Sequence, residues 1–251
     1  GSGSGLRVKA TLIHFLASVA FAMLAATVVF FTWFPDGLSD LMRGGELFWL
    51  VVGCDVVLGP LLSFVICSPT KSRRMLVLDY AVIVALQLSA LAYGLSVVAA
   101  SRPVFVVFSI DRLDVVSAFE VDTVEPPNAA ALRNFPVSWT GPRMVALKLP
   151  TDTQGRNEAL TFELNGGELQ TQPRYFAPFS SEAALARAQS LDGLRTTHPQ
   201  LADQAIAAAA AAGLRPDAVA WLPVRSRFGF NTAVLRRADA SVVVYLVADA
   251  Q

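Results

Sequence analysis

The sequence predicts a membrane protein in which a three-helix transmembrane bundle is followed by a periplasmic α+β domain with a mostly antiparallel sheet. Three observations predict it: the N-terminal part holds three long apolar runs, charge returns after Ser101, and helical and strand patterns then alternate. Of the 251 residues, 16% are charged, whereas a soluble domain carries about 25%. We therefore expect a transmembrane domain over 6–101 and a soluble domain over 102–251.

Each apolar run is long enough to cross a bilayer. The runs cover Thr11–Phe34, Leu47–Cys67 and Met75–Ala100, and about 20 apolar residues span the hydrocarbon layer. The first run exceeds the apolar core of a signal peptide, so we expect it to remain as a span. Residues 1–5 read Gly-Ser-Gly-Ser-Gly, which is the composition of a cloning remnant.

Basic residues in the short loops predict the orientation of the spans. The N-terminal flank and the loop between the second and third spans are basic, namely at Arg7, Lys9, Lys71, Arg73 and Arg74. The loop between the first two spans is acidic overall, with Arg43 set against Asp36, Asp40 and Glu46. Positive loops stay in the cytoplasm. We therefore expect a bacterial inner-membrane protein with a cytoplasmic N-terminus and a periplasmic C-terminal domain.

Charge balance and cysteine placement exclude some roles. The 20 basic and 20 acidic residues cancel, so nothing indicates binding to nucleic acid. Cys54 and Cys67 lie at different depths of the second run, so they cannot pair with each other within one helix.

Polar residues inside the spans need a reason, because a charged side chain at mid-bilayer costs about 2.5–3.5 kcal/mol. Asp55 lies near the middle of the second run and is followed by Gly59 and Pro60. Pro60 predicts a kink, and glycine permits close approach of a second helix. The other spans carry matching polar and small residues on one face each, among them His14, Asp79, Gln87 and Gly94.

Three roles for these residues are open. They can hydrogen-bond to one another and hold the bundle together, or they can receive the transmembrane helix of a client protein. Proton or ion transport is the third role, although three short spans offer little room for a pathway.

The region after Ser101 shows the pattern of an α+β domain. Strands are predicted at 104–110, 113–119, 144–149, 218–224, 230–236 and 241–247. Helices are predicted at 129–134, 156–164, from Ser180 onward, and over the alanine-rich stretch 198–212. Ala238-Asp239 predicts that the last two strands form a hairpin.

No constellation of catalytic or metal-binding residues stands out in this domain. Its single histidine is His198, and no serine elbow, metal-spaced cluster or phosphate loop is present in the sequence. We expect no enzyme activity, cofactor or metal. Asp111, Arg112 and Asp114 form a charged group that is either a local ion pair or a contact surface near the membrane. Basic residues near the final strands read as a solvated edge or a partner surface: Arg225, Arg227, Arg236 and Arg237.

Several segments resemble the TfpX/TfpZ family of type IV pilin accessory proteins. The resemblance runs from about Leu6 to the C-terminus, and its most specific piece is Asp55-Val56-Val57-Leu58-Gly59-Pro60. Other matching segments are Leu12-Ile13-His14, Gln87-Leu88, Tyr93-Gly94, Arg102-Pro103-Val104, Ile110-Asp111-Arg112, Thr140-Gly141-Pro142, Pro173-Arg174-Tyr175-Phe176 and Trp221-Leu222-Pro223-Val224-Arg225. Phe176 departs from the family pattern, in which a second tyrosine is expected.

The resemblance implies a non-enzymatic role in type IV pilus biogenesis, in which the protein assists assembly of its cognate major pilin in the inner membrane. As a hypothesis, the polar spans hold the pilin helix and the external domain contacts the pilin head, so that the protein acts as a chaperone or delivery factor. Membrane lipid and pilus platform proteins are further expected partners. Two alternatives are a membrane-anchored envelope enzyme or sensor, and a scaffold subunit of the pilus platform.

Overall fold

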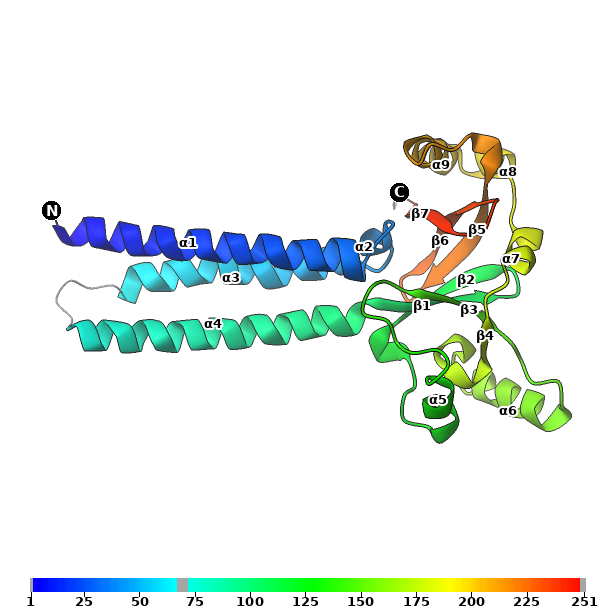
Figure 1. Ribbon diagram of the computed structural model, residues 1–251, viewed down its shortest axis with the longest axis horizontal. Coiled ribbons are helices and arrows are strands. Elements are labelled where there is room, and N and C mark those ends of the chain that lie inside the picture. The colour runs from blue at the N-terminus through cyan, green and yellow to red at the C-terminus, as the bar shows by residue number, and fades with distance from the viewer. Residues whose placement is uncertain (1, 67–71, 249–251) are drawn as a thin grey trace. The chain divides into compact units, whose positions relative to one another are not determined.

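The computed structural model describes residues 2–66 and 72–248, and this chain divides into two compact units. The first unit contains the residues up to 32 together with 44–100. The second contains 33–43 and the residues from 101 onward. Figure 1 shows the long helices of the first unit and the sheet of the second.

Within the described residues, three helices are long and apolar enough to cross a membrane, which confirms the predicted spans. They cover Thr11–Trp33, Gly44–Ile66 and Arg73–Ser101. The first consists of α1 (Ser2–Val28) from Thr11 onward and a π-helical turn (Val29–Trp33), and the others are α3 (Gly44–Ile66) and α4 (Arg73–Ser101). Residues Cys67 and Lys71 lie outside the described residues, so the predicted cysteine geometry and part of the basic loop are not described.

The strands of the described residues form one seven-stranded sheet in the order β4-β3-β1-β2-β5-β6-β7. Their bounds are β1 Pro103–Ser109, β2 Arg112–Ser117, β3 Arg143–Leu147, β4 Phe176–Pro178, β5 Val219–Ser226, β6 Gly229–Arg236 and β7 Val242–Leu246. Two neighbouring pairs, β1 with β3 and β2 with β5, are parallel, and the others are antiparallel. The mostly antiparallel α+β class is therefore confirmed.

Helices of the second unit pack on different parts of this sheet. The helices are α2 (Leu38–Leu41), α5 (Pro126–Ala131), α6 (Thr153–Leu164), α7 (Ser181–Arg187), α8 (Leu191–Thr197) and α9 (Pro199–Ala211). Helices α8 and α9 bury leucines and alanines against β5 and β6, while the core around Phe105 and Phe176 lies at the β1–β3–β4 side. In Figure 1, α8 and α9 accordingly lie beside β5–β7, and α5 and α6 lie beside β3 and β4.

Local chemistry explains where several helices begin and end. The Asp152 carboxylate accepts a hydrogen bond from the Gly155 N–H at 2.7 Å and caps α6. The Ser180 hydroxyl accepts from the Ala183 N–H at 3.2 Å and caps α7. Helix α9 begins at Pro199 and is followed by Gly213, whose φ of +72° suits a helix terminus.

The structure differs from the predicted boundaries at several places. Helix α5 covers Pro126–Ala131 and not 129–134, because prolines are tolerated in the first turn of a helix. Strand β2 ends at Ser117 and not at Phe119, because the Glu120 carboxylate accepts from the Ser117 N–H at 2.7 Å and a 3₁₀ turn begins. Helix α6 begins before 156, at its aspartate cap. The short elements α8 and β4 were not predicted from the sequence.

The segment between the first two spans, residues 33–43, belongs to the second unit. Its apolar side chains are buried, namely Phe34, Leu38, Leu41 and Met42. The Tyr245 N–H of β7 donates to the Asp36 carbonyl oxygen at 2.9 Å. Gly37 has a φ of +85°, and a Cβ there would lie 2.6 Å from the Tyr245 carbonyl oxygen, so the turn requires glycine. Residues 33–43 and the C-terminal domain therefore lie on the same side of the membrane.

Candidate functional site

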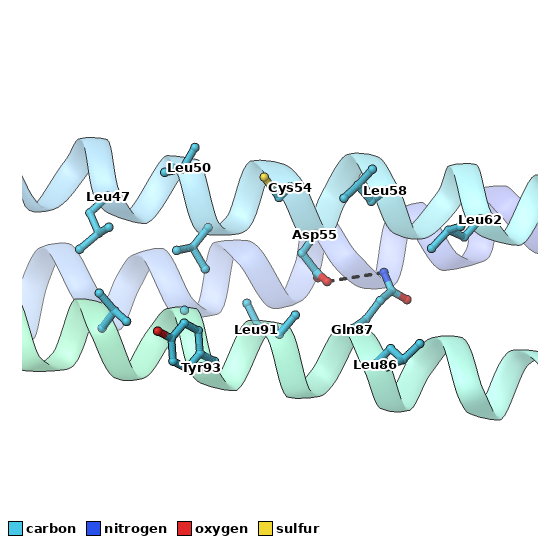
Figure 2. A pocket seen from close by; sticks show the side chains of 14 residues that line it. Leu47, Leu50, Cys54, Asp55, Leu58, Leu62, Leu86, Gln87, Leu91 and Tyr93 are labelled. Atoms are coloured by element: carbon cyan, nitrogen blue, oxygen red, sulfur yellow. Dashed lines mark hydrogen bonds between the residues drawn. The ribbon is translucent and has the colours of Figure 1, made fainter.

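A groove of about 610 Å³ lies between α3 and α4 in the first unit. Helix α1 packs directly against α3, whereas side chains from α3 and α4 line the groove (Figure 2). Most of its lining is apolar, including Leu47, Leu50, Leu58, Leu62, Leu86 and Leu91. The groove therefore presents an apolar surface within the membrane spans.

Asp55 and Gln87 are the polar pair in this groove. Figure 2 shows Asp55 extending from α3 toward Gln87 on α4, and the Gln87 Nε2 donates to the Asp55 Oδ1 at 3.5 Å. This distance is at the long limit of a hydrogen bond. A hydrogen bond between membrane helices contributes about 0.6–2 kcal/mol, which is less than the roughly 2.5–3.5 kcal/mol that a mid-bilayer aspartate costs. The hydrogen bond to Gln87 therefore offsets only part of the free-energy cost of placing Asp55 in the membrane.

A second polar contact links α1 to α3. The His14 Nδ1 lies 2.6 Å from the Ser63 hydroxyl oxygen, and the Tyr80 hydroxyl of α4 donates to the Ser63 carbonyl oxygen at 3.5 Å. Ser63 is fully buried, so the contact with His14 satisfies its hydroxyl, and the contact with Tyr80 adds a hydrogen bond to its backbone carbonyl. All three membrane helices therefore meet through hydrogen-bonding groups.

Gly59 brings the two polar contacts together. A Cβ at Gly59 would collide with the Gln87 amide and would lie 3.1 Å from the His14 Nε2. Gly59 therefore leaves the space into which side chains from α1 and α4 both reach. Its neighbour Pro60 is buried within α3.

Gly94 allows close approach of α3 and α4 at the other end of the groove. A Cβ at Gly94 would collide with the Val51 side chain. Asp79 lies about two turns before Gln87 on α4 and is half-buried. The structure thus brings His14, Asp55, Gly59 and Gln87 together, and it places Asp79 and Gly94 at separate positions.

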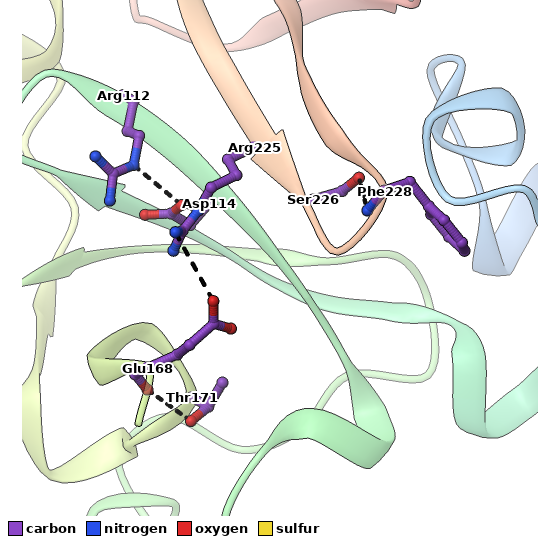
Figure 3. A network of polar contacts seen from close by, with 7 residues as sticks. All are labelled: Arg112, Asp114, Glu168, Thr171, Arg225, Ser226 and Phe228. Atoms are coloured by element: carbon purple, nitrogen blue, oxygen red, sulfur yellow. Dashed lines mark hydrogen bonds and ion pairs between the residues drawn. The ribbon is translucent and has the colours of Figure 1, made fainter. Parts of the chain in front are cut away.

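Two members of the charged group predicted after Ser101, Arg112 and Asp114, belong to an ion-pair network around a buried carboxylate (Figure 3). The Asp114 side chain is 2% exposed, and its Oδ1 accepts from the Arg225 Nε at 2.6 Å and the Arg112 Nε at 3.2 Å. Asp114 and Arg225 lie opposite each other in the β2–β5 ladder. Glu168 extends the network, with its Oε1 3.8 Å from an Arg225 nitrogen.

Asp111 does not belong to this network, because it lies exposed in the β1–β2 turn. The sequence analysis placed Arg225 on a solvated edge or a partner surface, but β5 is an inner strand and Arg225 pairs with a buried carboxylate. Sequence spacing could not reveal this pair, because the strands that carry it are far apart in the chain. Across residues 2–66 and 72–248, no group of three histidine, cysteine or acidic side chains could hold a metal ion.

Segment 33–43 is a feature that the sequence analysis missed. Its apolar residues alternate irregularly with glycine, proline and acidic residues, so the pattern reads as an ordinary loop. A usable signal was the density of large apolar residues, including Phe34, Leu38, Leu41 and Met42, in a short connection between spans.

The known proteins that this chain resembles are described as fimbrial assembly proteins. The family model "Fimbrial assembly protein FimB" matches residues 5–42, which cover the whole first span and all of segment 33–43 except Arg43. A fimbrial assembly protein of serogroup I from Dichelobacter nodosus is 35% identical over 171 residues, which are 68% of this chain and 66% of the relative. The chain thus spans slightly under two thirds of that relative.

Two further relatives from Dichelobacter nodosus carry the same description. The fimbrial assembly protein of serogroup E1 is 32% identical over 195 residues, which are 75% of either chain. That of serogroups C1 and C2 is 38% identical over 117 residues, which are 47% of this chain and 89% of the relative. No solved structure matches the chain. With a third of its residues identical over three quarters of both chains, this protein belongs to the fimbrial assembly protein (FimB) family.

Proposed function

We propose that this protein is an accessory factor of type IV pilus assembly that holds the apolar N-terminal helix of its cognate major pilin in the groove between α3 and α4. The observation that carries the proposal is this groove, which is lined by leucines and crossed by the Asp55–Gln87 pair. Family membership supports the process, and the resemblance to TfpX/TfpZ proteins supports the pilin as client. The role is one of binding and delivery, without catalysis.

The energetics of the groove favour a helical client. In lipid, helices associate through close packing and hydrogen bonds, because lipid tails are as apolar as leucine. The small side chains of Cys54 and Ala90 line the groove and permit close packing of a third backbone. A donor on the client helix would supply Asp55 with the second hydrogen bond that its long contact to Gln87 leaves available.

The proposed location is the bacterial inner membrane, with the second unit in the periplasm, where pilin heads are exposed. Positive charge at Arg73 and Arg74, the first two residues of α4, supports a cytoplasmic position of the loop between the second and third spans. Alkaline phosphatase fused after Gln251 should be active in cells, whereas a fusion after Ser72 should be inactive. The opposite pattern would refute the orientation.

Site-specific photo-crosslinking in native membranes tests the groove. A benzophenone amino acid at Leu86, which lines the groove, should form an adduct with the major pilin. Leu88 is the matched control, because it is similarly exposed, lies two residues away on α4 and is not part of the lining. An adduct at Leu86 and none at Leu88 is the expected result.

Equal labelling of pilin from Leu86 and Leu88, or from neither with both proteins present, would contradict the proposal. An adduct from Leu86 to a pilus platform protein would favour the scaffold role. A second measurement uses Asp55→Asn, for which we expect reduced capture of pilin at an unchanged level of the accessory protein.

A further inference from the structure

Arg227 in the turn between β5 and β6 lies between two exposed phenylalanines, Phe119 and Phe228, and a third, Phe230, follows at the start of β6. Phe119, Phe228 and Phe230 are 53%, 43% and 65% exposed. The Arg227 guanidinium lies 4.9 Å from the Phe119 ring centroid and 4.6 Å from that of Phe228. We call these four residues the turn cluster. Exposed aromatic rings gathered on a domain surface are typical of an interaction site.

Segment 33–43 fixes the position of this cluster relative to the membrane. Arg43 immediately precedes the second span, which begins at Gly44, so Arg43 lies at the membrane surface whatever the arrangement of the two units. The Arg43 guanidinium is 5.6 Å from the Phe228 ring centroid, and the Ser226 hydroxyl donates to the Leu41 carbonyl oxygen at 3.4 Å. Figure 3 shows Phe228 extending from the turn toward the segment that carries α2.

The register of the sheet gives the same position independently. Pro103 follows the third span closely and pairs with Ser117 at the end of β2. Strand β2 runs parallel to β5, so β5 ends on the same side of the sheet as β2, close to the start of β1. Phe119 follows β2, and Phe228 follows β5. The turn cluster therefore lies at the same strand ends at which β1 begins, directly after the third span.

A third contact at the membrane surface agrees with this placement. Trp33 ends the first span, and its ring centroid lies 6.1 Å from that of Trp139, which is 59% exposed. Tryptophan is enriched where proteins meet lipid headgroups. Arginine binds phosphate oxygens, and aromatic rings enter the interfacial layer.

We propose that the turn cluster is an interfacial membrane anchor. The rings of Phe119, Phe228 and Phe230 enter the headgroup layer of the bilayer that holds the spans, and Arg227 binds a phospholipid phosphate. The partner is phospholipid and not protein. Arg43 is covalently joined to α3 and Pro103 follows α4 closely, so the strand ends that carry the turn cluster stay near the bilayer. The anchor limits the motion of the sheet relative to the membrane surface.

A fluorescence measurement on the full chain tests this anchor. A cysteine-free chain, with Cys54→Ala and Cys67→Ala, receives Phe230→Cys labelled with the polarity-sensitive dye NBD. The protein is placed in nanodiscs of phosphatidylethanolamine and phosphatidylglycerol, with or without lipid that carries a nitroxide near the headgroup. The matched control is Ile110→Cys. Ile110 is 72% exposed and lies in the β1–β2 turn, at the opposite ends of the strands from the turn cluster.

At position 230 we expect blue-shifted emission and loss of most emission with the nitroxide lipid. At position 110 we expect water-like emission, quenching by aqueous iodide and little quenching by the nitroxide lipid. Equal behaviour at the two positions would overturn the proposal, as would blue-shifted emission at 230 without nitroxide quenching. Phe119→Cys provides a second label if Phe230→Cys does not fold, and the same two outcomes decide.

Discussion

Asp114 is the residue on which the charge network of the second unit depends. Its carboxylate is buried on β2 and accepts from two arginines through one oxygen, while Arg112 and Arg225 are 34% and 26% exposed. Each arginine keeps part of its hydration, so loss of one arginine is tolerated better than loss of the shared carboxylate. The stability of the network therefore depends more on Asp114 than on either arginine.

Replacement of this carboxylate should destabilise the second unit. Asp114→Ala leaves Arg225 half-buried without its closest acceptor, and we expect the free energy of unfolding to fall by about 1–3 kcal/mol. Arg215→Ala is the control, because Arg215 and Asp217 form an exposed pair whose contribution is about 0–1 kcal/mol. Denaturant unfolding of the detergent-solubilised chain, followed by near-UV circular dichroism, measures both. Equal losses would assign Asp114 no special role.

Asp122 should make the second unit sensitive to acid. Partial burial opposes ionisation of Asp122, but hydrogen bonds from the Glu125 and Val124 N–H groups and from the Asn128 and Gln172 side chains outweigh it and lower its pKa below 3.8. Ionised Asp122 therefore stabilises the fold above pH 3.8, and this contribution is lost as the pH falls through the lowered pKa.

The Asp122→Asn variant lacks this titration. We expect its Tm to be lower than that of the parent chain at neutral pH and the difference to shrink as the pH drops below 3.8. Thermal unfolding across a pH series measures the difference, with the exposed Asp203→Asn as control. A difference between parent and Asp122→Asn that stays constant with pH would contradict the assignment.

At the scale of elements, glycines set how closely α3 approaches its neighbours. Gly94 faces the Val51 side chain, Gly59 faces the end of the Gln87 side chain, and Gly53 has open space around its Cβ position. Valine is stiff at χ1 and cannot yield, whereas the Gln87 amide can rotate away. The same glycine-to-alanine change therefore has three different consequences on one helix pair.

We expect Gly94→Ala to weaken α3–α4 packing most, because a Cβ there collides with Val51. Gly59→Ala should displace the Gln87 amide and remove its hydrogen bond to Asp55, at a cost of about 0.6–2 kcal/mol. Gly53→Ala should be neutral or stabilising by up to about 1 kcal/mol, since alanine favours helix. Unfolding in mixed SDS micelles ranks the three variants. A larger loss for Gly53→Ala than for Gly94→Ala would refute this ranking.

At the scale of the whole molecule, local sequence pattern predicted which segments are helices and which are strands. The order of the strands depends on long-range pairing, which local pattern does not contain. Hydropathy predicted the three spans, and β-branched runs predicted six strands, because each signal lies within one segment. Strand order could not be predicted, since β1 pairs with β3 and β2 with β5 across long connections. Asp55 and Gln87 could be singled out because polar residues are rare within a span, and mutual hydrogen bonding was one of the roles open to them. The contact of Asp114 with Arg225 depends on strand order.

The place of segment 33–43 within the second unit leads to a prediction across the length of the chain. Leu38 and Leu41 are 0% and 1% exposed, and the segment's Asp36 carbonyl oxygen accepts from the Tyr245 N–H on β7. Leu38→Ala with Leu41→Ala should cost about 2–5 kcal/mol for each leucine. It should also release the segment from β7, so hydrogen exchange at the Tyr245 amide should rise.

Leu164→Ala is the control for this double variant, because Leu164 is 77% exposed on α6. Hydrogen exchange with mass spectrometry on the full chain reports peptides from β7 and from β3. If exchange rises at β7 and stays low at β3, segment 33–43 acts as a clamp on one edge of the sheet. Unchanged exchange at β7 would show that the sheet edge holds without the loop. Because residues 33 and 44 continue into membrane spans, such a clamp couples the sheet edge directly to the membrane helices.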